Sequence, residues 1–379
     1  MNAHGDTAVG GAEKHVAELA GELSRRGHAV DLLQAFPDAG PPEFGGRRTV
    51  LHSKHWRTSE VRRLRNHLED VVVPLRRRVR EVIVWQAPDL VHTHNLPGLG
   101  TGTWEICRLL DVPVVHTLHD YYLLCPRVTL TKRDGRACRP ALFCGLRARR
   151  LGRFGGAVGD VVGVSRYVLD RQAHVFPRAR RHVIRNPVTT EIVASTPPGE
   201  QLRTIGFIGS LEQVKGVHVL LEAAPELVRR GCTVVLAGSG RLEAEVRAAA
   251  ARGAVRFLGY VSGPSKTAFF DTCDLGVVPS VWEEPGAYSA IEWLSSGRPV
   301  LVSLRGGLSE MIDSASGAIA VDPTPQGIVS AVERLLESTA WQRAVSRVRP
   351  MGSDRAFTHW LDAHEAVYEA AVVSGAKRE

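Results

Sequence analysis

Short β-branched runs alternate with amphipathic segments along the chain, a pattern that predicts parallel sheets covered by helices on both faces. The strands are expected at 29–33, 90–92, 112–117, 161–164, 204–208, 233–238, 255–257, 275–278, 299–302 and 318–321. The helices are expected at 11–26, 61–86, 217–230, 242–252, 265–272 and 286–296. The alternation therefore predicts an α/β protein made of two doubly wound, Rossmann-like domains that face each other across a cleft.

Residues 186–199 are the best candidate linker, because they are polar and rich in residues that favour turns. We expect an N-terminal domain over 1–190, a C-terminal domain over 200–354, and a last helix over 355–379 that crosses back to the N-terminal domain. A doubly wound domain opens with a strand, but residues 1–9 contain no apolar run able to form one. We therefore expect that this strand is missing, and that the native start lies upstream or the chain is a truncated product.

The composition is that of a globular protein, with 44% hydrophobic and 23% charged residues among 379. No apolar stretch in the sequence is long enough to span a membrane, and no signal-peptide pattern opens it. The six cysteines are unevenly spaced and do not form the framework of a secreted disulfide-rich domain. We expect a cytoplasmic protein, and the 42 arginines against 6 lysines are typical of a GC-rich bacterial genome.

The net charge of +8 is concentrated in the first half, because residues 1–190 carry +12 and the remainder −4. Clustered arginines could meet an anionic membrane surface, so peripheral membrane contact through the N-terminal domain is one expectation. Interruption by Glu69, Asp70 and Glu81 favours the alternative, an ordinary solvated helix face. Aromatic residues do not interleave with the arginines, so nucleic acid is not an expected partner. The clusters comprise Arg62, Arg63, Arg65, Arg76, Arg77, Arg78, Arg80, Arg147, Arg149, Arg150 and Arg153.

Two glutamates in the last third of the chain, Glu284 and Glu292, are the most informative candidates for a ligand-binding site. Pro285 and Gly286 favour a loop or a helix start, which places Glu284 in the loop and Glu292 about two turns inside the next helix. Carboxylate oxygens held in this way can accept hydrogen bonds from the hydroxyls of a sugar. A surface helix with two ordinary acids would give the same spacing, so the neighbouring motifs decide.

Glycine turns recur at strand ends around this pair, at 206–216, 238–240 and 306–307, and Gly10-Gly11 precedes the first helix. The first of these turns carries Lys215 beside a helix start, where an ammonium and exposed amides together favour phosphate. Each turn alone is weak support for a ligand. Their order and spacing relative to the two glutamates are more specific.

Together these motifs resemble retaining glycosyltransferases of family 4, which have the GT-B fold, and the resemblance extends from Gly10 to about Tyr368. It implies that the C-terminal domain binds a nucleotide sugar. Lys215 then matches the lysine that binds the diphosphate, Glu284 the glutamate near the sugar hydroxyls, and Glu292 the glutamate that holds the ribose.

The resemblance also assigns residues that lie around the phosphates and the sugar. In the segment His116-Thr117-Leu118-His119-Asp120, His119 is matched to the histidine that approaches the donor sugar. The remaining matched positions near the donor are Gly10, Gly11, Ser210, Gly238, Ala287, Tyr288 and Ser289. Two positions depart from the family pattern, because Ser210 stands where arginine is usual and Gly286-Ala287 replaces Phe-Gly. Arg241 is a candidate to replace the missing arginine.

The implied reaction is transfer of a sugar from a nucleoside diphosphate with retained anomeric configuration. No metal or other cofactor is required if Lys215 and helix amides neutralise the departing diphosphate. Neither Glu284 nor Glu292 is assigned as a nucleophile. The acceptor is open: a glycan, a lipid-linked sugar and a small molecule all fit. Two other functions stay open, a nucleotide-sugar epimerase of the same fold and a catalytically impaired partner subunit that binds nucleotide sugars.

Two further groups of residues could bind metal. Cys125, Cys138 and Cys144 could hold zinc in a polar loop, although the irregular spacing without a Cys-x-x-Cys pair favours reduced thiols. His92 and His94 follow a strand, where such a pair more often lines a cleft, so we expect an acceptor-side or structural role for them.

Overall fold

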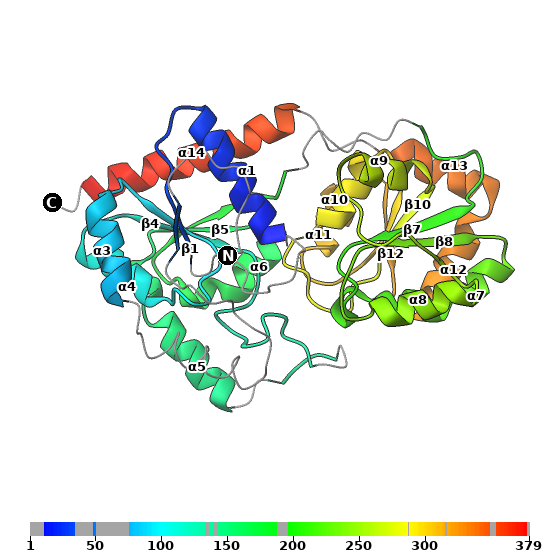
Figure 1. Ribbon diagram of the computed structural model, residues 1–379, viewed down its shortest axis with the longest axis horizontal. Helices are drawn as coiled ribbons and strands as arrows, with labels where there is room; N and C mark the ends of the chain where they lie inside the picture. Colours follow the sequence, from blue (N-terminus) through cyan, green and yellow to red (C-terminus); the bar gives the residue numbers. More distant parts are fainter. Residues whose placement is uncertain are drawn as a thin grey trace. The chain divides into compact units, whose positions relative to one another are not determined.

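The computed structural model describes residues 11–34, 48–50, 76–132, 136–139, 142–187, 196–286, 288–314, 317–348 and 354–376. The chain divides into two compact units (Figure 1). Unit 1 comprises Met1–Leu130, Arg139–Asn186 and His359–Glu379, and unit 2 comprises Thr131–Cys138 and Pro187–Thr358. The expected missing strand at residues 1–9 and the segment 61–75 of the expected basic helix lie outside the described residues.

Unit 1 contains a parallel sheet with the order β3-β4-β5-β6. These strands are β3 (Val91–Thr93), β4 (Val114–Leu118), β5 (Asp160–Gly163) and β6 (Arg180–Val183). Every residue of β4 and β5 is buried, whereas the first two residues of the edge strand β6 are exposed. A separate parallel pair joins β1 (Leu32–Gln34) to β2 (Arg48–Val50).

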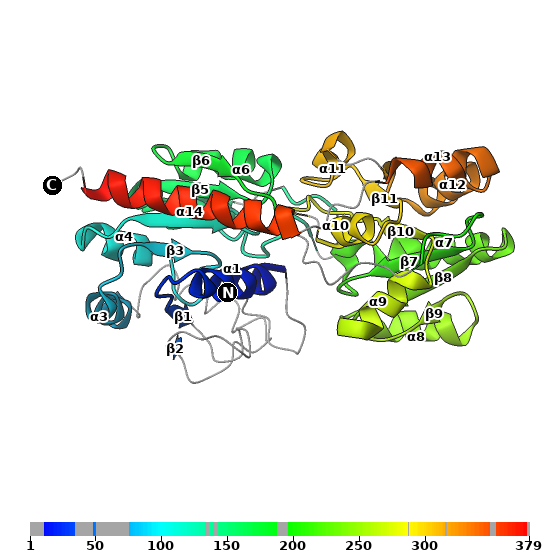
Figure 2. The ribbon, with the colours of Figure 1, turned by 90° about the horizontal axis from the view of Figure 1, so that it is seen from above.

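Unit 1 also contains several helices. They are α1 (Gly11–Arg25), α3 (Arg76–Gln86), α4 (Gly102–Leu109), α5 (Leu142–Gly152), α6 (Arg166–Gln172) and the 3-10 helices η1 (Gly155–Ala157) and η2 (Ala173–Val175). The long helix α14 (Asp354–Ala376) runs beside α1 in both views (Figure 2). Arg26, just after α1, pairs with Asp362 and Glu365 of α14, and the ring of His15 packs edge-on against Trp360. No described helix is long and apolar enough to cross a membrane.

Unit 2 is built on a six-stranded parallel sheet with the order β12-β11-β10-β7-β8-β9. The strands are β7 (Thr204–Ile208), β8 (Thr233–Ala237), β9 (Arg256–Phe257), β10 (Leu275–Val278), β11 (Val300–Ser303) and β12 (Ala318–Val321). The chain reverses its direction of winding between β7 and β10, as in doubly wound folds. This switch point is where such sheets bind ligands.

Two separate hydrophobic cores cover the two faces of this sheet. Alternate residues of β8 divide between them, Val234 and Leu236 in one and Val235 and Ala237 in the other. One core contains residues of α7, α8, α12 and α13, and the other residues of α9, α10 and α11. These helices are α7 (Val217–Arg229), α8 (Glu243–Ala251), α9 (Gly263–Asp271), α10 (Tyr288–Ser295), α11 (Ser309–Ser314), α12 (Pro325–Leu335) and α13 (Ser338–Arg347).

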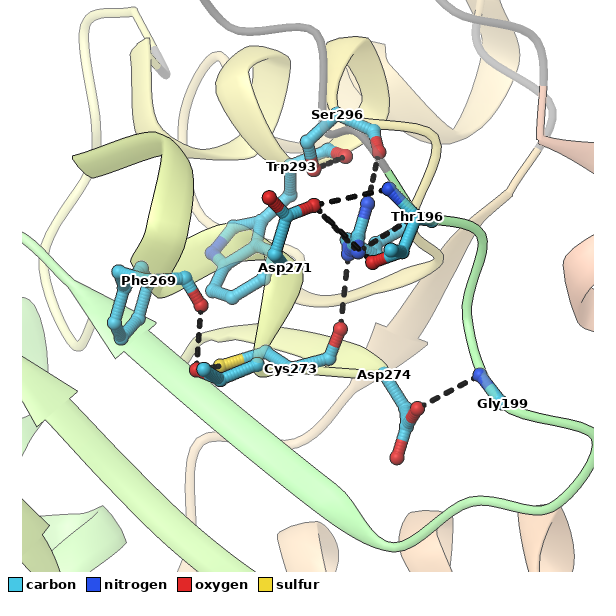
Figure 3. Close-up of polar contacts among 10 residues, drawn as sticks. Thr196, Gly199, Phe269, Asp271, Cys273, Asp274, Trp293 and Ser296 are labelled. Carbon is cyan, nitrogen blue, oxygen red and sulfur yellow. Dashed lines mark hydrogen bonds and ion pairs between the residues drawn. The ribbon is translucent and has the colours of Figure 1, made fainter. Parts of the chain in front are cut away.

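A buried arginine ties the start of unit 2 to its sheet. Arg298 donates to the backbone carbonyls of Cys273 and Thr196, at 2.9 and 2.8 Å, and also to that of Ser296. The carboxylate of Asp274 accepts from the amides of Gly199, Arg203 and Thr204, and Figure 3 shows the bond from Gly199. The Ser-Ser-Gly-Arg-Pro-Val motif that follows Glu292 therefore anchors the end of the linker.

The strands of unit 2 were predicted well, since 204–208, 275–278 and 318–321 match β7, β10 and β12. Other predictions need correction. The strand expected at 29–33 begins only at Leu32, the helix expected at 286–296 begins at Tyr288, and Gly286 lies outside it. Strand β6 and helices α4, α5, α6, α11, α12 and α13 were not predicted.

Candidate active site

The predicted lysine and the first predicted glutamate both lie at the switch point of unit 2. Lys215 ends the 3-10 helix η3 (Gln213–Lys215) after β7, and Glu284 follows β10, the strand hydrogen-bonded to β7. The Nζ atom of Lys215 lies 2.7 and 3.0 Å from the two carboxylate oxygens of Glu284. Two residues 69 positions apart therefore form one charged pair at the carboxyl edge of the sheet.

The glutamate is the buried member of this pair. Glu284 is 3% exposed, whereas the side chain of Lys215 is 31% exposed and its ammonium lies 5.3 Å from the centre of the Trp282 ring. The hydroxyl of Ser280 donates to Glu284 Oε1 at 2.6 Å, and Ser303 donates to the carbonyl of Ser280 at 2.7 Å. A chain of hydrogen bonds from β11 thus fixes the carboxylate while the ammonium faces partly toward solvent.

Two glycines hold the loops that carry this pair. Gly216, directly after Lys215, has φ +74°, and a Cβ atom there would lie 1.9 Å from the carbonyl oxygen of Pro279. Gly306 has φ +60°, and a Cβ atom there would lie 2.4 Å from the carbonyl oxygen of Glu284. Only glycine fits either position, because the backbone conformation and the close approach both exclude a side chain.

The second predicted glutamate lies on α10. Glu292 is 7% exposed, and its Oε1 atom accepts from Lys266 Nζ of α9 at 2.7 Å. The next residue, Trp293, packs on β7 and β10, where Cβ atoms at Gly206 and Gly276 would lie 2.4 and 2.3 Å from its ring. These strand glycines let α10 approach the sheet closely, and this sets the position of Glu292.

The other donor-side residues lie in loops or at the start of α10. Tyr288 and Ser289 lie in the first turn of α10, and Ala287 lies outside the described residues. Ser210 is exposed. A Cβ atom at Gly238 would lie 1.9 Å from the carbonyl oxygen of Gly209, so Gly238 allows two loops to pack together.

Arg241, the candidate replacement for the missing arginine, is paired within its own neighbourhood. Its Nε atom lies 3.7 Å from Glu212 Oε2, and its backbone amide donates to Glu212 Oε1 at 3.3 Å. The side chain is largely exposed. Arg241 is therefore held beside the loop that carries Ser210.

The predicted histidine of unit 1 belongs to a larger histidine cluster. His119 follows β4, and its Nε2 atom lies 3.0 Å from Nδ1 of His94, which follows β3. The ring of His15, from α1, lies 4.7 Å from that of His119. Gly11 begins α1, and Gly10 lies outside the described residues. The carboxyl edge of the unit 1 sheet thus collects imidazoles contributed by three elements.

These imidazoles are neutral at neutral pH. Burial, followed by the charges of neighbouring groups, lowers the pKa of His94 and of His119 well below 6.5. Burial also lowers the pKa of His15 to about 3. The same burial raises the pKa of Asp120 to about 6. A neutral His119 can accept or donate a hydrogen bond to a sugar hydroxyl but carries no charge for the phosphates.

The residues that position the predicted ones were not expected from the sequence. Ser280 and Ser303 hold Glu284, Lys266 holds Glu292, and Asn186 accepts from the His15 ring nitrogen Nδ1 at 3.0 Å. The position of His15 in the helix after Gly10-Gly11 was a usable signal, whereas the partners arise only from packing. All six cysteines are free thiols.

Two models of known protein families match most of the chain. The family model described as Glycosyltransferase Family 4 matches residues 9–192, and the one described as Glycosyl transferases group 1 matches 202–338. An uncharacterized glycosyltransferase of Methanocaldococcus jannaschii is 34% identical over an alignment that covers 89% of this chain and 88% of the relative.

Solved structures match over nearly the full length. Sucrose-phosphate synthase from Thermosynechococcus elongatus superposes with a TM-score of 0.72 at 17% identity, covering 95% of this chain and 94% of that one. Anabaena HepE, solved in complex with UDP-glucose, gives a TM-score of 0.66 at 16% identity over 97% of this chain and 98% of its own. At these identities the structures establish the fold.

Proposed function

The chain belongs to glycosyltransferase family 4 and has the GT-B fold, and from this premise we propose a specific reaction. The protein transfers a sugar from a nucleoside diphosphate to a glycan, lipid-linked or small-molecule acceptor, with retention of the anomeric configuration. The observation that carries the proposal is the Lys215–Glu284 pair at the switch point, because it joins a phosphate-binding cation to a sugar-binding carboxylate.

The pair suggests how the donor is bound. A diphosphate near Lys215 competes with Glu284 for the ammonium, which is the more exposed partner. As the ammonium turns to the phosphates, the Glu284 oxygens become free to accept hydrogen bonds from sugar hydroxyls, while Ser280 keeps the carboxylate in place. Donor binding therefore replaces one ion pair with contacts to both ends of the ligand.

Charge that develops on the leaving diphosphate is stabilised by Lys215 and by the backbone amides at Tyr288 and Ser289 in the first turn of α10. This arrangement supplies the positive charge without a metal cofactor. Glu292 holds the ribose, His119 contacts the donor sugar, and neither glutamate acts as a nucleophile. These roles follow from the family resemblance residue by residue.

The two alternatives kept open on the sequence predict different products. An epimerase would convert the donor without an acceptor, and an impaired partner subunit would bind the donor without releasing nucleotide. The comparisons with known proteins favour neither. Peripheral membrane contact also remains part of the proposal, and we place it on α5, whose exposed side chains are apolar and basic.

The test measures nucleotide release from a panel of nucleotide sugars, beginning with UDP-glucose, with and without candidate acceptors and in the presence of EDTA. We expect release that depends on acceptor and a product with the anomeric configuration of the donor by NMR. Lys215→Ala should lower turnover by about two orders of magnitude or more, because it removes the cation at the leaving group.

Arg343→Ala is the matched control, since it removes an exposed cation of α13 in the same unit. This control should keep full turnover. Near-normal turnover of Lys215→Ala would remove the lysine from the mechanism, and an inverted product would overturn retention. Release that needs no acceptor would support the epimerase instead.

A further inference from the structure

Three histidines of unit 1 converge with the spacing of metal ligands. His15 comes from α1, His94 follows β3 and His119 follows β4. One ring nitrogen of each lies within 4.8 Å of the corresponding atoms of the other two. Across the described parts of the chain, this is the only group of three or more His, Cys, Asp or Glu side chains with such spacing, and the three cysteines 125, 138 and 144 do not form one.

The hydrogen bonds of His15 leave one ring nitrogen available. Its Nδ1 atom lies 3.0 Å from the side-chain oxygen of Asn186, which can only accept, so Nδ1 carries the proton. The lone pair is then on Nε2, a buried atom with no hydrogen-bond partner among the described residues. A buried acceptor without a partner is costly, and a bound cation would satisfy it.

His94 and His119 provide the other two nitrogens. His94 Nδ1 and His119 Nε2 lie 3.0 Å apart, which two neutral rings maintain by sharing one proton. Both atoms can bind an ion once the ring that donates this proton changes tautomer and carries it on its other nitrogen. In a tetrahedral zinc site the bond length of about 2.1 Å places neighbouring nitrogens about 3.4 Å apart. The two rings are therefore close to the spacing that an ion requires, and His15 needs only a short movement to complete the set.

We propose that His15, His94 and His119 form a binding site for a divalent transition-metal ion such as Zn²⁺, and that the bound ion inhibits sugar transfer. Three neutral imidazoles with one open position are a donor set that Zn²⁺ accepts well. Burial keeps these imidazoles neutral, the state in which they bind metal. The inhibition rests on the proposed function, because an ion that engages His119 withdraws it from the donor sugar.

Two neighbouring residues support the choice of these three histidines as ligands. Asn186 orients His15 through the ring nitrogen that does not face the ion, as outer ligands do in metal sites. His92 lies in the same cluster, but its Nδ1 pairs with the Tyr368 hydroxyl at 2.7 Å and its Nε2 with the Thr117 hydroxyl at 2.8 Å. Both of its nitrogens are occupied, so His92 is excluded as a ligand and serves as a matched control.

The experiment uses full-length protein without a histidine tag, stripped of metal with EDTA and then freed of chelator. Calorimetry should show one Zn²⁺ bound per chain, and Co²⁺ should give the visible absorption of a tetrahedral site that Zn²⁺ displaces. His15→Gln and His94→Gln should each weaken Zn²⁺ binding more than tenfold, and Asn186→Ala by about tenfold. His92→Gln and the exposed His174→Gln should bind as the unmodified protein does.

Circular dichroism in metal-free buffer shows whether each variant is folded, and only folded variants are compared. Absence of Zn²⁺ binding by the unmodified protein, or binding that survives in both His15→Gln and His94→Gln, would overturn the site. If both of these variants are unfolded, loss of binding in a folded Asn186→Ala supports the site, and unchanged binding there overturns it.

The activity assay tests the second half of the proposal. Zn²⁺ should inhibit transfer, EDTA should restore it, and His15→Gln should require more Zn²⁺ for inhibition by the same factor as its loss of affinity. Zn²⁺ that binds without inhibiting would overturn the inhibitory role and leave the site and the transferase standing. A protein inactive without metal on every donor and acceptor would count instead against the proposed function.

Discussion

At the scale of single residues, the two units differ in the ionisable groups that they bury. Glu284 is almost fully buried, and both Lys215 and Ser280 donate to its carboxylate. Burial lowers the pKa of the histidines in the unit 1 cluster and keeps them neutral. The candidate site of unit 2 is thus held by an ion pair, and the cluster of unit 1 consists of uncharged imidazoles.

The neutral histidines make the stability of unit 1 dependent on pH. His116 is 3% exposed, and burial lowers its pKa to about 3 from 6.5 in the unfolded chain. Below pH 6.5 the unfolded state therefore binds a proton at this ring that the folded state does not bind. The free energy of unfolding falls by up to about 1.4 kcal/mol for each pH unit by which the pH is lowered. Asp120 works in the opposite direction, because its raised pKa of about 6 stabilises the folded state as the pH falls below that value.

His116→Gln should remove the first of these effects. Denaturant titrations at several pH values give the slope of the unfolding free energy against pH. Between pH 6.5 and about 5 we expect this slope to be smaller in the variant by about 1 kcal/mol per pH unit. Asp120 is present in both proteins, so its effect cancels. The exposed His174→Gln is the control and should keep the original slope. An unchanged slope in His116→Gln would show that this ring is accessible to protons in the folded state.

The sequence motifs pointed to Lys215 and Glu284 separately, and the structure pairs them. Each could be identified because each follows a readable strand, Lys215 in a glycine turn and Glu284 directly before Pro285-Gly286. It could not identify Ser280, Lys266 or Asn186, which are ordinary polar residues until the fold brings them within hydrogen-bond distance. Such partner residues are defined by tertiary contacts, so no local sequence pattern identifies them.

At the scale of elements, prediction succeeded for the buried strands of both sheets and failed for the exposed edge strand β6. The strands β7, β8 and β10 read as apolar runs because helices cover both of their faces. Strand β6 carries Arg180, Arg181 and His182 at the edge of its sheet, so it lacks an apolar run. Helix α12 had a usable signal, since Thr324 caps it and Pro325 begins it, and the amide of Gly327 donates to the Thr324 hydroxyl at 3.0 Å.

Helix α5 carries a surface suited to anionic lipid. Leu142, Phe143 and Leu146 are at least half exposed and lie on the stripe that continues into Arg149 and Arg150. A helix binds a membrane surface when its apolar side chains enter the bilayer and its arginines contact the lipid phosphates. Figure 1 shows α5 standing apart from the sheet of its own unit. Arg147 does not contribute, because it is buried and donates to the carbonyl of Tyr122.

Vesicle sedimentation tests this surface. The protein should bind vesicles that contain phosphatidylglycerol, not vesicles of phosphatidylcholine alone, and salt should weaken binding. Arg149→Glu with Arg150→Glu should reduce binding by about tenfold or more, since each basic residue contributes about 1 kcal/mol. Arg343→Glu, an exposed cation of unit 2, should change little. Equal loss in both variants would mean that overall charge, and not α5, drives binding.

At the scale of the whole chain, sequence order and structural grouping differ at two places. Thr131–Cys138 group with unit 2 although unit 1 precedes and follows them, and His359–Glu379 group with unit 1 after the whole of unit 2. The turn-rich linker at 186–199 and the return of the last helix to the N-terminal domain were expectations from the sequence, whereas the grouping of Thr131–Cys138 was not. For α14 the contacts are specific, since Tyr368 reaches His92, Arg26 pairs with Asp362, and Arg180 donates to Ser374.

These contacts make unit 1 depend on the last residues of the chain. Tyr368→Phe removes the hydroxyl that pairs with His92 Nδ1 at 2.7 Å, and it leaves a partly buried ring nitrogen without this partner, which costs about 1 kcal/mol or more. Hydrogen exchange should show faster exchange of amides in β3, β4 and α1, while amides of β7, β8 and β10 keep their protection. Val373→Ala, which shortens an exposed side chain of the same helix, should leave both sets unchanged. Equal loss of protection in the two sheets would mean that the units unfold together and that α14 stabilises the whole chain.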